Sequence, residues 1–159
     1  MDVLHFMKEE YVAIRALSRG LLPGDLVESI DGAALVSFMS KLALMLRLGD
    51  ELIIPELTDD HSRYRGAGSM AEVQSAELQS FLVTFKRSKS VPEKRREVFF
   101  SKISGHVDFM EQTVLPAFRE LIPTAIREEI GEIAADYRKD ASELAAKVAK
   151  RLEGSTISA

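Results

Sequence analysis

The sequence predicts an all-α fold, an up-and-down four-helix bundle with an additional C-terminal helix, in one domain over residues 1–153 that ends in a flexible tail at 154–159. Five segments carry apolar residues at the 3.6-residue period of a helix, and turns rich in glycine, proline or polar residues separate them. No Asn-Gly or Asp-Gly pair stands between alternating flanks, so no β-hairpin is predicted. Helices joined by short turns pack as antiparallel neighbours, which gives the up-and-down bundle.

The first two helices are separated by a clear stop signal. The first is predicted over residues 3–19, because apolar positions follow the helical period until Gly20 and Pro23 end it. The second is predicted over residues 25–57, with Pro55 tolerated near its end as a kink that loses one backbone hydrogen bond.

The second helix is apolar on every side around residues 42–48, a pattern typical of a helix covered on more than one face. The cover is either the fifth helix together with the segment 25–34, or a second subunit. Exposed apolar patches of this kind commonly mark interfaces. We therefore predict a homodimer or a protein partner that binds the outer face of this helix.

The third and fourth helices, predicted over residues 69–88 and 90–121, each begin at a capping box, in which Ser and a Glu three residues later bind free backbone N–H groups. Pro92 is expected in the first turn of the fourth helix, where no N–H is needed. The polar stretch 58–68 is predicted as the longest loop. The two boxes are Ser69–Glu72 and Ser90–Glu93.

The fifth helix is predicted over residues 124–152, with Thr124 as its N-cap. Arg127 stands where a capping box would need Glu or Gln, so the start is weakly marked. One apolar stripe runs along the helix, and we expect it to dock along the bundle. The stripe consists of Ile126, Ile130, Ile133, Tyr137, Leu144, Val148 and Leu152.

Composition excludes several classes of function. A net charge of −4 and a pI near 5.5 argue against a nucleic-acid partner, which needs a basic face. No cysteine is present, so any metal would need nitrogen and oxygen ligands. The longest apolar run is far short of the roughly 20 residues of a membrane span, and no signal peptide follows Met1, so we expect a cytoplasmic protein without a membrane partner.

A shared pattern occurs in the second and fourth helices. A polar residue, Arg47 or His106, is followed four or five residues later by a carboxylate, Glu51 or Glu111, and then by an aliphatic pair and a proline. The pattern resembles helices 2 and 4 of the hemerythrin-like (HHE cation-binding) family. That family is a four-helix bundle that holds a non-haem di-iron centre with five histidines and two bridging carboxylates. The resemblance covers about residues 3–152.

The resemblance implies a degenerate metal site. The residual candidate ligands are Glu51, His106 and Glu111. Arginine stays protonated and cannot donate a lone pair, so it cannot stand in for a histidine ligand. We therefore expect no cofactor, with iron as the alternative. The family's other four ligand positions are replaced by Tyr11, Arg47, Gln74 and Leu78.

The arginine at a ligand position suggests how the interior could survive without metal. We expect Arg47 to be buried and to neutralise Glu51 and Glu111, helped by the Tyr11 hydroxyl and the Gln74 amide. The alternative is that Arg47 lies on the surface and pairs with a neighbouring carboxylate there.

Three classes of function follow from these residues. The first is a non-catalytic regulatory or interaction protein, with no catalytic or cofactor-binding residue predicted. The alternative is a metal-dependent O2, NO or redox sensor, or an iron-binding protein, with a rearranged site on Glu51, His106, Glu111 and Tyr11. An enzyme with a metal-free pocket is the third class, but no Ser-His-Asp arrangement or phosphate-binding loop supports it.

Overall fold

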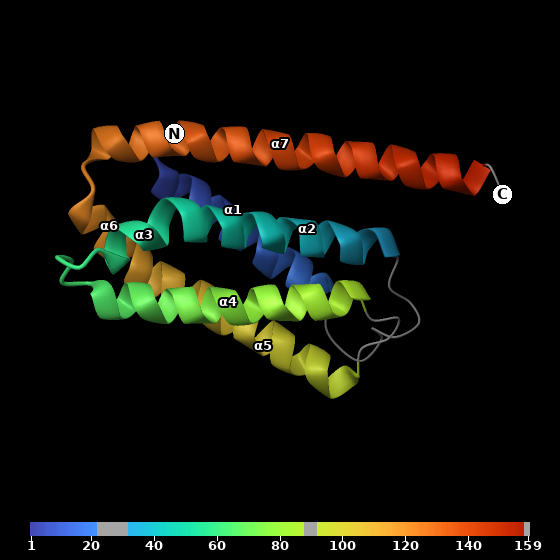
Figure 1. The fold of residues 1–159 in the computed structure, drawn as a ribbon, viewed down its shortest axis with the longest axis horizontal. Helices are drawn as coiled ribbons and strands as arrows, with labels where there is room; N and C mark the ends of the chain where they lie inside the picture. The colour runs from blue at the N-terminus through green and yellow to red at the C-terminus, as the bar shows by residue number, and fades with distance from the viewer. Residues whose placement is uncertain (22–31, 88–91, 158–159) are drawn as a thin grey trace.

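The computed structural model describes residues 1–21, 32–87 and 92–157, and every regular element within them is a helix. Figure 1 shows helical rods packed side by side as a bundle, with the long C-terminal helix along the outside. The predicted all-α bundle with an additional C-terminal helix is confirmed. The elements are α1 (Val3–Leu21), α2 (Gly32–Leu48), η1 (Gly49–Ile53), α3 (Ile54–Thr58), α4 (Arg65–Arg87), α5 (Glu93–Phe109), η2 (Met110–Val114), α6 (Leu115–Leu121) and α7 (Thr124–Ile157).

Two rods each contain a π-helical turn directly before a proline. In η1 the backbone N–H of Ile54 donates to the carbonyl of Gly49, five residues back, and η2 repeats this bond. Pro55 and Pro116 follow in the next turn. A proline ring clashes with the carbonyl four residues back in an α-helix, and a wider turn relieves that clash while the rod continues. The kink predicted near Pro55 takes the form of this π turn.

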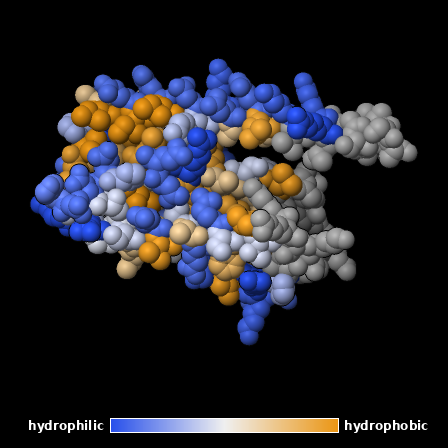
Figure 2. Space-filling model, in the orientation of Figure 1, coloured by the Kyte–Doolittle hydropathy of each residue, from blue (hydrophilic) through white to orange (hydrophobic). Residues whose placement is uncertain are grey.

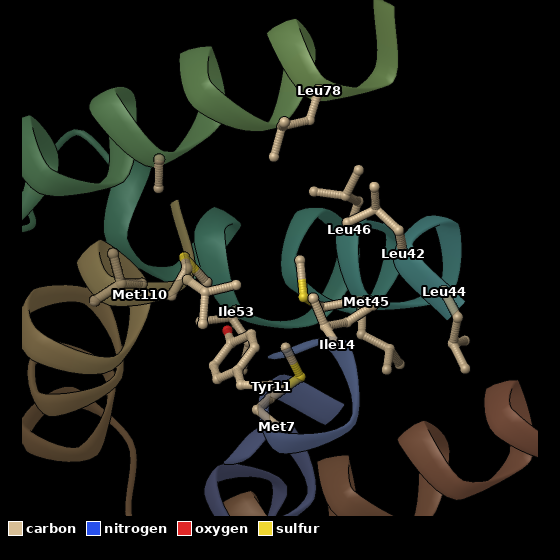
Figure 3. Packing of buried hydrophobic residues seen from close by; sticks show 14 of the residues in the cluster. Met7, Tyr11, Ile14, Leu42, Leu44, Met45, Leu46, Ile53, Leu78 and Met110 are labelled. Atoms are coloured by element: carbon tan, nitrogen blue, oxygen red, sulfur yellow. The ribbon is translucent and has the colours of Figure 1, made fainter. Parts of the chain in front are cut away.

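The apolar second helix is covered within a single chain. Leu42, Met45 and Leu46 are all buried, and α1 and α7 both pack against α2. Figure 3 shows Leu44 pointing away from these core side chains, toward α7. The apolar side chains on which the predicted partner contact rested are therefore buried within the chain, and the homodimer or protein partner itself stays a prediction. The other predicted cover, the segment 25–34, lies mostly outside the described residues.

The fifth helix docks along the bundle as predicted, and Ile130 and Tyr137 of the predicted stripe pack against the core, but the centre of the docked face lies elsewhere. Its buried positions in the described part are Arg127, Gly131 and Ala134, whereas Ile126 and Ile133 are 46% and 44% exposed. Figure 2 shows apolar side chains on the surface around the first turns of α7. The face is set by close approach, since a Cβ atom at Gly131 would overlap the N-terminus of the chain. The small side chains at Gly131 and Ala134 let another backbone come near, which an isoleucine at either position would prevent.

Helix starts differ from the predicted capping boxes. α4 begins at Arg65, so Ser69 lies inside the helix and does not cap it. Gly68 also lies inside this helix. The position suits glycine because α3 packs so closely that a Cβ there would lie 2.9 Å from a side-chain carbon of α3. Pro92, with ψ at 140°, precedes α5 and is not in its first turn. Ser90, the other predicted cap, lies outside the described residues.

The two ends of α7 also differ from the prediction. Thr124 is already helical and is not the N-cap, because the backbone N–H of Arg127 donates to the carbonyl of Pro123. The helix continues through Ile157, beyond the predicted end, and the flexibility of the tail 154–159 stays a prediction. Among the described residues, no helix combines the length and apolarity that crossing a lipid bilayer requires.

Candidate functional site

The one histidine retained at a ligand position lies inside the bundle and is already bonded. His106 of α5 is 4% exposed, and its Nδ1 atom lies 2.8 Å from the side-chain oxygen of Gln74 in α4. An amide oxygen only accepts, so the hydrogen is assigned to Nδ1. Burial lowers the pKa of His106 to about 4, because the charged imidazolium loses its hydration. The imidazole is therefore neutral at pH 7.

Two other ligand positions are occupied by the phenol of Tyr11 and the aliphatic side chain of Leu78. Tyr11 is buried, and its hydroxyl has no hydrogen-bond partner among the described residues. Loss of hydration, with the nearby negative charge of Glu111, raises the pKa of this phenol, so it stays protonated. Leu78 and Met110 are buried in the same core, and Figure 3 shows Tyr11 with Met110 and Ile53 in that packing.

The predicted buried arginine lies on the surface instead. The side chain of Arg47 is 55% exposed, and its Nε atom pairs with Glu51 at 3.2 Å. The residues on either side, Leu46 and Leu48, are both buried, which directs the side chain between them outward. The prediction that Arg47 neutralises an interior site is wrong, and the surface alternative is confirmed.

Glu51 faces the fifth helix and not the bundle interior. The hydroxyl of Tyr137 donates to its Oε2 atom at 2.6 Å, and the guanidinium of Arg47 lies 4.4 Å from the centre of the Tyr137 ring. Hydrogen bonding from Tyr137, and then the bond and charge of Arg47, lower the pKa of the Glu51 carboxyl. These three side chains form an exposed contact between η1 and α7.

Glu111 points in a third direction. Its carboxylate pairs with Arg15 of α1, and the same guanidinium lies 2.8 Å from Asp108. All three carboxylate and guanidinium groups are partly exposed. Glu111 therefore ties α5 and η2 to α1 at the rim of the bundle.

The donors as arranged do not fit a di-iron centre. Glu51 is bonded to Tyr137, His106 to Gln74 and Glu111 to Arg15. No three histidine, aspartate or glutamate side chains in the described part of the chain are grouped so that they could hold a metal ion. A di-iron bundle needs several imidazoles and carboxylates that point inward together.

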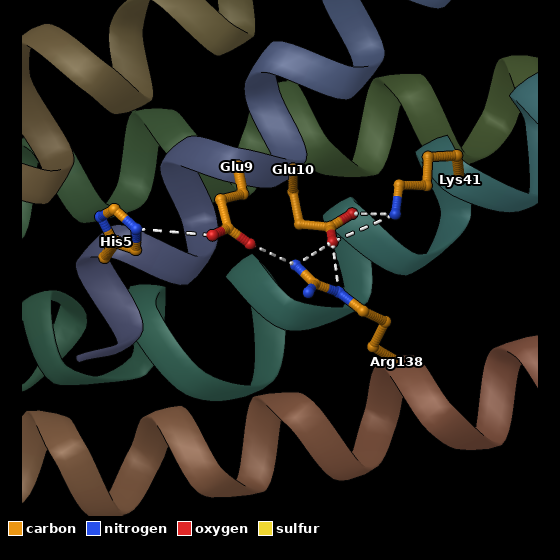
Figure 4. A network of polar contacts seen from close by, with 5 residues as sticks. All are labelled: His5, Glu9, Glu10, Lys41 and Arg138. Atoms are coloured by element: carbon orange, nitrogen blue, oxygen red, sulfur yellow. Dashed lines mark hydrogen bonds and ion pairs between the residues drawn. The ribbon is translucent and has the colours of Figure 1, made fainter. Parts of the chain in front are cut away.

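Among the described residues, the buried carboxylate is Glu10, which was not predicted from the sequence. Glu10 of α1 is 1% exposed, and its carboxylate lies 3.0 Å from Lys41 of α2 and 2.7 Å from Arg138 of α7. Arg138 also pairs with Glu9 at 3.3 Å and stacks on the ring of Phe6, with its guanidinium carbon 3.7 Å from the ring centre. Figure 4 shows this network joining three helices. An interior acid neutralised by arginine, the arrangement expected at Arg47, is found here.

A signal for Glu10 was present in the sequence. Val3, Met7 and Ile14 mark the buried stripe of α1, and Glu10 falls at the helical spacing between the last two. A charged residue within an apolar stripe predicts a buried charge with partners on neighbouring helices.

A shallow recess lies between η1, α3 and α4. Its volume is about 570 Å³, and it is lined by the carboxylates of Asp50 and Glu72 with apolar atoms of Ile54 and Pro55. Partial burial raises the pKa of Asp50 against the opposing hydrogen bonds from α4, and the charge of Glu72 adds to that rise. The recess is acidic and holds none of the predicted site residues.

Comparison with known proteins identifies a solved structure with a similar fold. No protein-family model matches the sequence, and a search of curated proteins gives no significant match. The structure is similar to that of a hemerythrin HHE cation-binding domain-containing protein from Mycobacterium kansasii, with a TM-score of 0.74 and 24% sequence identity. The alignment covers 92% of this chain and 91% of that chain. The chain has the fold of a hemerythrin-like domain.

Proposed function

We propose that this hemerythrin-like bundle has lost its di-iron centre and acts as a non-catalytic regulatory or interaction protein in the cytoplasm, without nucleic-acid or membrane partners. The observation that carries the proposal is the bond between His106 and Gln74. This bond leaves the one retained histidine in a neutral contact, and three of the other ligand positions or their neighbours, Leu78, Met110 and the protonated phenol of Tyr11, belong to one buried core.

The energetics of the interior support the same proposal. A bundle that buries iron also buries the carboxylates that bind it, and those charges become costly when the metal is absent. Here Glu51 and Glu111 lie at the surface with protein partners of their own, and His106 is neutral. The interior therefore needs no metal charge to remain stable, because a neutral hydrogen-bonded pair carries no such penalty.

Metal analysis of the purified protein tests the proposal. The protein would be expressed with added iron, purified without chelators and measured by inductively coupled plasma mass spectrometry. We expect far less than two iron atoms per chain, a colourless solution and an unfolding temperature that EDTA leaves unchanged. Stoichiometric iron with a charge-transfer band in the near ultraviolet would contradict the loss of the centre.

A metal-dependent sensor or iron-binding protein remains the second candidate, because the buried hydroxyl of Tyr11 has no partner among the described residues. An unpaired buried donor is costly unless something binds it. The similarity to a protein described as cation-binding points the same way. Tyr11→Phe separates the two candidates. It leaves stability equal or higher if the interior is metal-free, whereas it lowers iron content if Tyr11 is a ligand.

A further inference from the structure

The fifth helix is an accessory to a bundle that has a core of its own. The buried side chains of α1 to α6 pack on one another, whereas Ala134 is the one fully buried apolar side chain in the described part of α7. Ile130, Tyr137 and Ala141 are only partly buried against the bundle. Apolar burial therefore contributes less to the docking of α7 than to the contacts among the other helices.

Polar contacts hold α7 in place along its docked half, residues 124–141. Arg127 pairs with Asp2 at 2.8 Å, and Tyr137 donates to Glu51. Arg138 reaches Glu10, whose carboxylate is buried beneath α7. These contacts follow one another along the helix and join it to Asp2 just before α1, to α1 itself and to η1.

The surface under α7 combines apolar area with one buried acid. Phe6 and Leu44 are 2% and 7% exposed, with Arg138 stacked on Phe6 and Leu44 directed toward α7. Release of α7 would uncover these side chains and hydrate Glu10 together with Lys41. An apolar surface with a single carboxylate suits an amphipathic helix that carries one arginine, which is how α7 itself binds it.

We propose that α7 is a detachable strap, that the Glu10–Arg138 pair controls its release, and that the uncovered surface of α1 and α2 binds an amphipathic helix with an arginine in the position of Arg138. This inference deepens the proposed role as an interaction protein and rests on it. Iron analysis tests the loss of the di-iron centre separately, so failure of the proposed function is distinguishable from failure of the strap.

Hydrogen exchange measured by NMR on the full chain tests the release. We expect the amides of the docked half of α7 to exchange at least ten times faster than those around Leu42 in α2. Arg138→Met should accelerate the α7 amides at least a further ten-fold and leave the α2 amides unchanged. The matched control is Lys139→Met, at an exposed neighbour that takes part in none of the ion pairs found among the described residues, and it should change neither helix.

Equal acceleration of α7 and α2, or none, would overturn the proposal, because α7 would then be part of one cooperative unit. If Arg138→Met does not fold, Asp2→Asn removes the separate pair with Arg127 and must give the same selective acceleration.

The binding surface is probed with a labelled peptide of residues 124–157. It should bind the Arg138→Met protein at least ten-fold more tightly than wild type, because the chain's own α7 competes in wild type. Equal affinity for the two proteins would refute the strap.

Discussion

Removal of both cations that face Glu10 should destabilise the protein far more than removal of an exposed cation. In Lys41→Met/Arg138→Met the Glu10 carboxylate, 1% exposed, keeps no cationic partner from α2 or α7. Loss of the partners of a buried charge costs about 3 to 5 kcal/mol, and we expect about 3 here, because release of α7 can hydrate the carboxylate. The exposed pair at Arg47 is the control, and Arg47→Met should cost less than about 1 kcal/mol.

A third substitution separates charge from packing. Adding Glu10→Met removes the buried charge, so the triple variant should return to within about 1 kcal/mol of wild type, as for other ion pairs replaced by apolar residues. Urea unfolding followed by circular dichroism at pH 7 gives these free energies. If the triple variant is as unstable as the double variant, the loss comes from packing and the reasoning about charge is refuted.

Three further predictions concern single sites. Gly105→Ala should stabilise the protein by about 0.5 to 1 kcal/mol, because its Cβ meets nothing within 4 Å. Gly68→Ala should destabilise the protein by about 1 to 2 kcal/mol, because its Cβ would overlap with Leu57. Equal urea midpoints of the two variants would contradict the close packing of α3 on α4. His106 has a folded pKa of about 4, below its unfolded value, so the unfolded chain takes up a proton first and stability should fall by roughly 3 kcal/mol as pH drops from 6.5 to 4. His106→Leu should lose that part of the pH dependence, and identical pH profiles of the two proteins would count against a neutral buried imidazole. Tyr11→Phe should leave the free energy of unfolding equal or raise it by up to about 1 kcal/mol, because a buried hydroxyl without a partner is removed. A decrease of more than about 1 kcal/mol in urea unfolding would show that the hydroxyl has a partner.

The fold could be predicted because the helical period and the glycine and proline stops act locally. The outward direction of Arg47 could not be predicted in the same way. Apolar residues surround it on both sides along α2, so hydrophobic periodicity does not say which face is inside. The π turn before Pro55 has a separate effect, since it shifts the angular position of every residue after it and ends the helical period that runs through α2.

The candidate site was predicted in part, for a related reason. Alignment by motif placed Glu51 and Glu111 inside the bundle. In the structure each carboxylate is directed by its partner instead, Glu51 by Tyr137 and Glu111 by Arg15. Those partners lie 86 and 96 residues away in sequence, beyond the reach of any local pattern. Glu10 was within reach, because its position in the apolar stripe of α1 was visible in the sequence.

Native mass spectrometry of the chain after anaerobic incubation with excess Fe(II) shows whether the bundle still binds two iron atoms. Removal of unbound metal before the measurement leaves only ions held by the fold. We expect the mass of the metal-free chain, because His106 is bonded to Gln74 and no three possible ligands in the described part of the chain are grouped around one point. A dominant species with two iron atoms per chain would contradict this expectation.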